Sequence, residues 1–261
     1  MRILITGCTY APAFNGQSIF TTTLAEGLAR RGHEVWVLTP SVTGKPYYNE
    51  RNGVHIQTVS AIELRFLHNQ AYTAYFPDLE VHRFIKTCKP DIVHIQDHFP
   101  LSFSVLHAAR RSKIIVIGTN HFIPDNLAPY IPLLPKFKSF FNSILWMWMK
   151  WTFNSLDVVT APSSTAAEII RSQGVHVPVY PISCGVSFAR FHPDSAVDKK
   201  ALRLRYGLDP EKKTFLFVGR VDMEKRVDLL IRAVKILARK DIQLAVTGKG
   251  AALPMLKALV H

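Results

Sequence analysis

Two cations follow a predicted strand in the last third of the chain. The apolar run at 214–218 is typical of a buried strand, and Gly219, Arg220 and Lys225 come after it. A glycine at a strand end lets the backbone approach a ligand closely. An arginine in the loop and a lysine near the next helix can together neutralise a diphosphate. These residue types in this order favour a site for a phosphorylated ligand.

A second ligand-binding loop is expected near the N-terminus, at 10–17, between a strand at 2–6 and a helix at 17–32. The sequence turns at Gly16, and the helix that follows offers free N–H groups to an anion. The loop lacks the GxGxxG and GxxxxGK[ST] spacings, which argues against dinucleotide and P-loop sites. We therefore expect a flexible loop at the carboxyl end of a sheet.

Polar side chains follow two further predicted strands. Asp97 and His98 come after 91–96, and Asn120 and His121 come after 114–119, with Asn126 a few residues on. Open α/β sheets bind ligands at the carboxyl ends of their strands. We expect these residues to line one edge of a sheet.

The elements that must position these residues alternate between strand and helix, which predicts βαβ units, a parallel sheet and an α/β fold. Runs such as IVHI and KIIVIG suit strands that are buried on both faces. We expect strands at 2–6, 34–38, 54–59, 91–96, 114–119, 157–160, 214–218 and 242–247. We expect helices at 17–32, 76–88, 101–111, 137–153, 164–173, 198–206, 224–239 and 253–260. The residues expected to face inward are Ile19, Phe20, Leu24, Leu28, Leu79, Phe84 and Ile85.

These elements form two Rossmann-like halves, with domains expected at 1–182 and 183–261. The second half shows only two clear strands, and two parallel strands have no reason to be stable alone. We therefore expect the second domain to be incomplete.

The composition is that of a globular protein with a formal net charge of +13. The excess is +5 over residues 1–182 and +8 over 183–261. It could serve nucleic acid, an anionic membrane or a phosphorylated substrate. No nucleic-acid-binding motif accompanies it, so membrane and phosphate are the better interpretations. Three scattered cysteines argue against disulfides and a zinc site and fit a reducing cytosol. We expect no export signal and no transmembrane segment.

Four segments together resemble one family: YAPAFNGQ (10–17), RRGHEVWVLTP (30–40), PDIVHIQDH (90–98) and FVGRVDMEKRVDLLIRAV (217–234). It is the retaining glycosyltransferase family of GT-B architecture that includes phosphatidylinositol mannosyltransferases and diacylglycerol glucosyltransferases. The resemblance covers nearly the whole chain in the right order, and 217–234 is its most specific part. It implies two Rossmann-like domains, a UDP- or GDP-hexose donor as substrate, and no cofactor or metal.

The resemblance also assigns roles to residues. Gly219, Arg220 and Lys225 would hold the donor pyrophosphate, and Gly248 and Gly250 resemble a G-x-G near the nucleotide base. His121 would reach toward the transferred sugar, where imidazole can hydrogen-bond a hydroxyl. Asp97, His98, Asn120 and Asn126 would shape the acceptor pocket. No general base is expected, because the leaving phosphate takes the acceptor proton in the mechanism usually described.

Two departures from the family pattern stand out. Arg226 occupies a position where the family usually has glycine after the lysine. An EX7E pair of glutamates, which contacts the donor sugar, would follow the G-x-G beyond His261. We therefore expect a chain that keeps its phosphate-binding cations and lacks its sugar-contacting carboxylates.

The segment 137–153 is apolar almost all round a helix and carries Trp146, Trp148 and Trp151, with Lys138 and Lys150 nearby. Tryptophan and lysine together are typical of a membrane interface. A core helix with an aromatic stripe is an equally good interpretation.

The leading hypothesis is a hexosyltransferase with a lipid acceptor of the diacylglycerol or phosphatidylinositol type, cytoplasmic and peripheral on the inner face of the membrane. The alternatives are a soluble transferase for a small or phosphorylated sugar, and a non-catalytic chain or half of a split enzyme.

Overall fold

The computed structural model describes residues 1–13, 15–63, 72–75, 77–126 and 135–260; the side chains of Asn126, Pro135, Lys136 and Lys138 lie outside this description. The contacts divide the chain into two compact units, Met1–Gly185 and Val186–His261. Each unit is described separately below.

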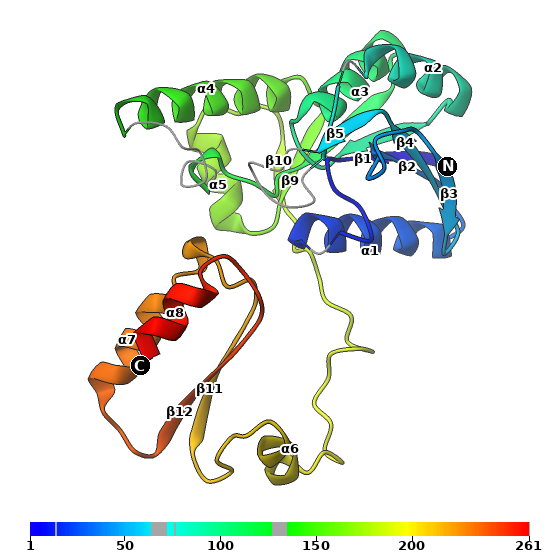
Figure 1. Cartoon of the computed structure of the whole chain (residues 1–261). Coiled ribbons are helices and arrows are strands. Elements are labelled where there is room, and N and C mark those ends of the chain that lie inside the picture. The colour runs from blue at the N-terminus through cyan, green and yellow to red at the C-terminus, as the bar shows by residue number, and fades with distance from the viewer. Residues whose placement is uncertain (14, 64–71, 76, 127–134, 261) are drawn as a thin grey trace. The chain divides into compact units, whose positions relative to one another are not determined.

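The first unit is built on an eight-stranded sheet in the order β10-β9-β8-β7-β1-β2-β4-β3 (Figure 1). All neighbours in this sheet are parallel except β3 and β4. The strands are β1 (Arg2–Thr6), β2 (Glu34–Pro40), β3 (Tyr48–Arg51), β4 (Val54–Val59), β7 (Ile92–Ile95), β8 (Ile115–Thr119), β9 (Val158–Ala161) and β10 (Val179–Pro181). A separate hairpin pairs β5 (Ala61–Glu63) with β6 (Tyr72–Ala74).

Helices cover the two faces of this sheet unequally. One face carries α2 (Asp78–Cys88), α3 (Pro100–Arg111), α4 (Pro135–Asn154) and α5 (Ser164–Ser172), whose apolar residues form one large core with β7, β8 and β9. The other face carries α1 (Gly16–Arg30), which packs on β1, β2 and β4 in a smaller core. Figure 1 shows α1 on the opposite side of the sheet from α2 and α3.

No described helix of the first unit lies over the α1 face of β8, β9 and β10. Ile115 is 55% exposed and Tyr180 is 55% exposed, while their neighbours Val116 and Val179 are buried on the other face. The KIIVIG run therefore does not give a strand buried on both faces, because α1 is too far along the sheet to reach it.

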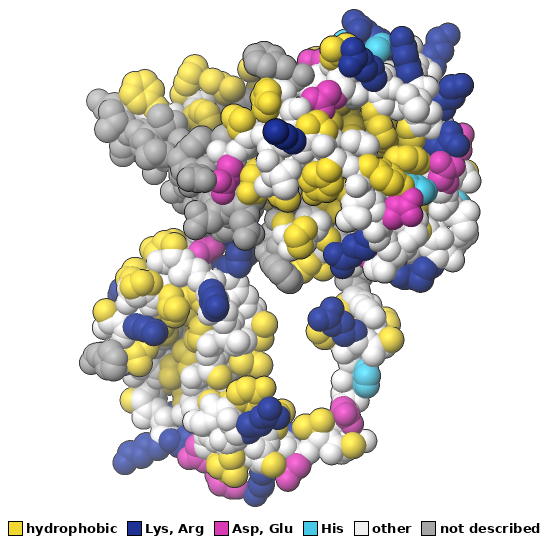
Figure 2. All heavy atoms as spheres, turned by 45° about the vertical axis from the view of Figure 1, so that its right-hand side comes forward, with side chains coloured by type: hydrophobic (Ala, Val, Ile, Leu, Met, Phe, Trp, Pro, Cys, Tyr) yellow, Lys and Arg dark blue, Asp and Glu magenta, His cyan; other side chains and the backbone are white. Residues whose placement is uncertain are grey.

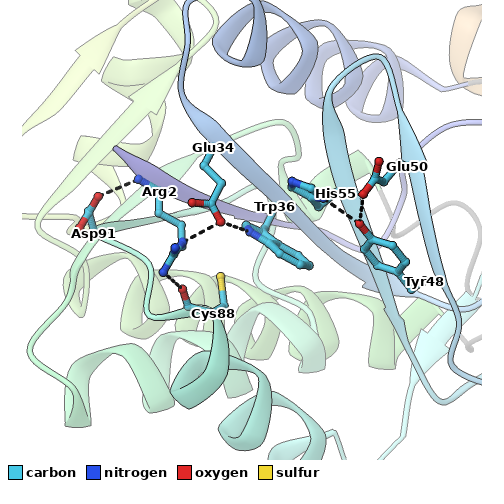
Figure 3. A network of polar contacts seen from close by, with 8 residues as sticks. All are labelled: Arg2, Glu34, Trp36, Tyr48, Glu50, His55, Cys88 and Asp91. Atoms are coloured by element: carbon cyan, nitrogen blue, oxygen red, sulfur yellow. Dashed lines mark hydrogen bonds and ion pairs between the residues drawn. The ribbon is translucent and has the colours of Figure 1, made fainter.

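A network of polar contacts links the strands at the amino ends of β1 and β2 (Figure 3). Arg2 at the start of β1 donates from its Nε to Glu34 Oε1 at 2.8 Å and from Nη1 to the Cys88 carbonyl at 2.6 Å. Its backbone N–H donates to Asp91 at 2.7 Å. The arginine and the indole of Trp36 lower the pKa of Glu34. The network joins β1 and β2 with the end of α2 and the residue before β7, away from the polar loops.

The second unit contains one parallel pair, β11 (Lys213–Val218) and β12 (Ile242–Thr247). Its helices are α6 (Lys199–Arg205), α7 (Val227–Leu237) and α8 (Leu253–Val260), with a short 3-10 turn at Met223–Lys225 before α7. A small core of four buried residues lies between them: Val221, Val227, Ala252 and Leu256.

Element types were predicted well, and besides the exposed face of β8 three details were wrong. Ile19 and Leu79 are exposed, at 60% and 62%, because they lie on the outer sides of α1 and α2. The helix expected at 224–239 is interrupted at Arg226, which has φ 49°. Strands β3, β5, β6 and β10 were not predicted.

Among the described helices, none combines the length and apolar character that crossing a bilayer requires.

Candidate functional site

The central strands of the first unit end side by side, which brings the polar loops together. β1, β7 and β8 are adjacent and end at Thr6, Ile95 and Thr119. The backbone continues as Gly7 from β1, as Gln96 from β7 and as Asn120 from β8. The predicted grouping of Asp97, His98, Asn120 and His121 at one carboxyl edge therefore agrees with the topology.

Both carboxylate oxygens of Asp97 are occupied by hydrogen bonds from within the first unit, which leaves little capacity for a ligand. Its Oδ2 accepts from the Cys8 N–H at 2.5 Å and from Gln17 Nε2 at 2.8 Å. Its Oδ1 accepts from the Phe99 N–H at 3.1 Å and from Ser102 Oγ at 2.7 Å. The side chain is buried. We therefore assign Asp97 to joining the loops after β1 and β7 with α1 and α3.

Gly7 is part of the same junction. A Cβ at this position would lie 2.9 Å from Gln17 Nε2 and 3.0 Å from Gln96 Cβ. A side chain here would push the Gln17 amide away from Asp97 and require Gln96 to shift, so glycine suits the point where β1 leaves the sheet beside β7.

His98 is buried in an aromatic cluster. Its ring stacks on Phe99 with centroids 5.3 Å apart and lies edge-on to Phe153 at 6.1 Å. Burial lowers the pKa of His98, and its Nε2 has no hydrogen-bond partner among the described residues. Its carbonyl accepts from Trp148 Nε1 at 2.6 Å. Because this imidazole is enclosed, contact with an acceptor would require a rearrangement.

His121 is held by Gln96. Its Nε2 lies 2.8 Å from Gln96 Oε1, and its ring contacts Phe20 with centroids 4.7 Å apart. Burial lowers the pKa of His121 to about 4, so the ring is neutral near pH 7. With the amide oxygen as its acceptor, Nε2 carries the proton, and Nδ1 can accept a hydrogen bond.

A cleft of about 560 Å³ opens next to this histidine, between α1 and the ends of β7, β8 and β9. Phe20 lines it and contacts His121. Its polar floor is a hydrogen-bonded row in which His94 Nε2 lies 2.7 Å from Thr119 Oγ1 and Thr119 Oγ1 lies 2.8 Å from Thr160 Oγ1. Burial lowers the pKa of His94 to about 4. The cleft is the right size for a sugar-sized ligand.

The remaining residues expected on the acceptor side are less informative. Asn120 is buried, and its Oδ1 accepts from the Phe122 N–H at 3.4 Å. Asn126 ends a 3-10 turn, Pro124–Asn126, and its side chain lies outside the described residues. Gly16 begins α1 behind the N-cap Asn15, whose Oδ1 accepts from the Ser18 N–H at 2.9 Å. Nothing lies within 4 Å of a Cβ built on Gly16.

In the second unit, the loops after β11 and β12 pack backbone to backbone. A Cβ on Gly248 would lie 1.8 Å from the Gly219 carbonyl oxygen, and one on Gly250 would lie 2.2 Å from that of Val221. Gly248 and Gly250 therefore have a structural role besides the ligand contact that the sequence resemblance implies.

The two predicted phosphate-binding cations lie in this loop and share one carboxylate. Glu224 Oε2 lies 3.4 Å from Arg220 Nη2, and its Oε1 lies 3.2 Å from Lys225 Nζ. Asp222 Oδ2 lies 3.1 Å from Arg220 Nη1, and its Oδ1 accepts from the Ala251 N–H at 3.1 Å. Asp222 thus joins the arginine to the loop after β12.

Arg226 keeps the turn that glycine would make. Its φ of 49° is left-handed, a region that glycine enters at no steric cost and other residues enter rarely. Its guanidinium pairs with Asp228 at 3.1 Å. The departure from the family pattern therefore changes the residue and preserves the backbone.

The aromatic segment forms α4, and its two sides differ. One side is buried through Met149 and Phe153. The other side exposes an apolar stripe that includes Trp151, which is 52% exposed. We call this surface the α4 stripe; its members are Phe137, Phe140, Ile144, Met147, Trp148 and Trp151. Figure 2 shows hydrophobic side chains along this helix.

The other residues expected at a membrane do not belong to the α4 stripe. Trp146 is half-buried and donates from Nε1 to Asp125 at 3.0 Å. Lys150 lies against Gly174, where a built Cβ would be 3.1 Å from Lys150 Cδ. The Lys138 side chain is outside the described residues.

Sequence reasoning missed three residues that organise these loops: Gly7, Gln96 and Asp222. Each directly follows a strand or lies in the loop after one, as the predicted residues do. Position alone could have found them, and their partners, which lie far away in sequence, could not be read from the chain.

Comparisons with known proteins agree with this architecture. Residues 14–190 match the family described as Glycosyltransferase Family 4, and residues 198–261 match Glycosyl transferases group 1. A GDP-mannose-dependent alpha-mannosyltransferase of Corynebacterium glutamicum is 27% identical over 96% of this chain and 58% of its own length. An alpha-monoglucosyldiacylglycerol synthase of Streptococcus pneumoniae is 27% identical over 98% of this chain and 58% of its own. The chain thus spans less than two thirds of these relatives.

Solved structures show the fold. Anabaena HepE, in complex with UDP and glucose, matches with a TM-score of 0.67 at 13% identity, over 99% of this chain and 64% of its own. WaaG, a glycosyltransferase involved in lipopolysaccharide biosynthesis, matches with a TM-score of 0.66 at 16% identity, over 99% and 66%. These matches confirm the expected α/β fold of GT-B type. The chain belongs to the glycosyltransferases of family 4, with the group 1 domain following the family 4 domain.

Proposed function

We propose that the protein transfers a hexose from a UDP- or GDP-sugar to a lipid acceptor of the diacylglycerol or phosphatidylinositol type, with retention, at a membrane surface. The observation that carries the transferase interpretation is the pairing of Arg220 and Lys225 on one carboxylate, in a loop after β11 that glycines let pack closely against the loop after β12. In this reaction the bond from C1 to the phosphate oxygen breaks. The acceptor oxygen bonds to C1 on the same face, and its proton passes to the leaving diphosphate.

The two cations would act on the leaving group. Negative charge grows on the departing diphosphate, so Arg220 and Lys225 would stabilise the transition state more than the bound substrate. His121, neutral and able to accept at Nδ1, would orient a sugar hydroxyl without carrying charge to the reacting centre.

The lipid acceptor is supported by the α4 stripe. Exposed apolar patches rimmed by polar residues mark interaction surfaces. Trp148 and Trp151 pack on Phe103 of α3, with centroids 5.0 and 5.2 Å from its ring, so this end of the stripe is held against α3. Tryptophan is favoured at the boundary between water and lipid.

A basic surface on the same unit supports membrane attachment. Arg83 and Lys86 of α2 and Arg111 of α3 are exposed and have no ion-pair partner in the described part of the chain. Lys and Arg side chains gather at the top of this unit in Figure 2, over α2 and α3. Such a surface would be attracted to anionic lipid. The three cysteines are free, as a cytoplasmic location would favour.

The test combines donor, acceptor and vesicle. The chain is incubated with UDP-glucose or GDP-mannose and vesicles that contain phosphatidylglycerol with diacylglycerol or phosphatidylinositol, and glycolipid is measured. Lys225→Ala should weaken UDP or GDP binding about tenfold. Unchanged affinity would refute the assignment of the cations.

Membrane binding through the α4 stripe is tested separately. Trp151→Ala should reduce co-sedimentation with anionic vesicles while leaving nucleotide binding unchanged. Transfer to a soluble sugar, with no vesicle binding at low salt, would establish the soluble alternative. An absence of any transfer with retained nucleotide binding would favour a non-catalytic chain.

A further inference from the structure

The charges in the candidate donor loop cancel one another. Arg220 lies 3.1 Å from Asp222 and 3.4 Å from Glu224, and Lys225 lies 3.2 Å from Glu224. Two cations thus face two carboxylates. A diphosphate that approaches this cluster meets no net charge and must compete with Glu224 for both cations.

Arg226 does not give this cluster a net positive charge. Its guanidinium pairs with Asp228, at 3.1 Å from Nε to Oδ1 and 3.2 Å from Nη2 to Oδ2. The cation that departs from the family pattern is therefore neutralised by its own helix.

Lys249 lies between Gly248 and Gly250, in the loop that packs against this cluster. Its carbonyl accepts from the Val221 N–H at 3.0 Å, which fixes its backbone beside Arg220 and Asp222. Its side chain is exposed, and its ammonium has no partner among the residues that the structure describes. It adds a positive charge that no carboxylate offsets.

We propose that Lys249 is a third contact to the donor diphosphate, and the one that gives the site its net positive charge. An unpaired ammonium binds a phosphate oxygen without first breaking an ion pair, whereas Arg220 and Lys225 must exchange one. A flexible lysine stem suits a point contact to phosphate. The inference rests on the proposed function, because it concerns the same donor site.

Calorimetry on the full chain tests it, with UDP and GDP as probes and uridine and guanosine as ligands without phosphate. Lys249→Gln should weaken the affinity for whichever of UDP and GDP binds by about tenfold and leave the affinity for the corresponding nucleoside unchanged. Lys249→Arg should restore most of the affinity. Lys240→Gln is the matched control, since it removes an exposed lysine before the amino end of β12, and it should change affinity less than about twofold.

A second variant separates charge from structure. Glu224→Gln in the Lys249→Gln background removes the competing carboxylate and should recover part of the lost diphosphate affinity. Diphosphate affinity unchanged by Lys249→Gln would overturn the inference while leaving the proposed function intact. An equal loss for nucleoside and diphosphate would also overturn it, because it would indicate a distorted loop. A wild-type chain that binds neither UDP nor GDP would overturn both.

Discussion

Asp97→Asn should destabilise the first unit far more than the same substitution at an exposed aspartate would. The carboxylate accepts four hydrogen bonds, two on each oxygen, from Cys8, Gln17, Phe99 and Ser102. An asparagine can satisfy only two of these donors and turns its NH2 toward the other two. A hydrogen bond to a buried charged group is worth about 1.5–3 kcal/mol, so the loss of two should cost about 3–6 kcal/mol.

The measurement is urea unfolding followed by tryptophan fluorescence. All four tryptophans, at 36, 146, 148 and 151, lie in the first unit, so their emission reports that unit alone. For a unit of this size the loss corresponds to a fall in Tm on the order of 10 °C. Asp91→Asn is the control, because Asp91 is exposed and its one hydrogen bond, from the Arg2 N–H, survives as an amide contact.

The result that would refute this reasoning is equally definite. If Asp97→Asn unfolds within about 1 kcal/mol of the wild type and instead weakens acceptor binding, then the carboxylate contacts the acceptor. The four hydrogen bonds would then be rearranged in the bound state.

Two further predictions concern His121 in the first unit and the glycines of both units. The pKa of His121 falls from 6.5 to about 4 on folding, so between these pH values the unfolded chain binds a proton that the folded chain does not, and stability falls as pH drops from about 6.5 to 4. In urea unfolding measured at each pH, His121→Gln should remove up to about 3 kcal/mol of that loss, while the contribution of His94 remains. An unchanged dependence of unfolding free energy on pH would contradict the burial argument. Gly248→Ala should disrupt the second unit, because its Cβ would lie 1.8 Å from the Gly219 carbonyl oxygen. Gly16→Ala should leave stability unchanged, because nothing lies within 4 Å of a Cβ at that position. Circular dichroism measures the stability of both variants and calorimetry measures their UDP affinity; a drop in UDP affinity for Gly16→Ala without a loss of stability would show that the ligand, and not the fold, requires this glycine.

Local pattern was enough to predict which of the candidate residues follow strands. Strands and helices alternate with clear punctuation, so the residues that follow 214–218 and 114–119 could be placed at strand ends by sequence pattern alone. The bounds of β12 and α8 agree with the prediction to the residue. Parallel topology then brings the strand ends together.

Partners could not be predicted, because they depend on which distant segments meet. Asp97 was expected to touch the acceptor, and only the fold reveals that Cys8 and Gln17 saturate it. Trp146 was grouped with Trp148 and Trp151 by composition, yet its indole turns to Asp125. The short strand β10 was missed because three residues carry too little pattern.

The uncovered α1 face of β8, β9 and β10 has a practical consequence for anyone purifying this chain. Ile115 of β8 and Tyr180 of β10 present exposed apolar side chains on this face of the first unit, and water is a poor solvent for them. Two such surfaces that meet would bury one another, so concentrated samples should scatter more light as ionic strength rises and repulsion between the basic chains is screened. Replacing Ile115 by lysine would keep the strand and improve the colloidal behaviour of the sample.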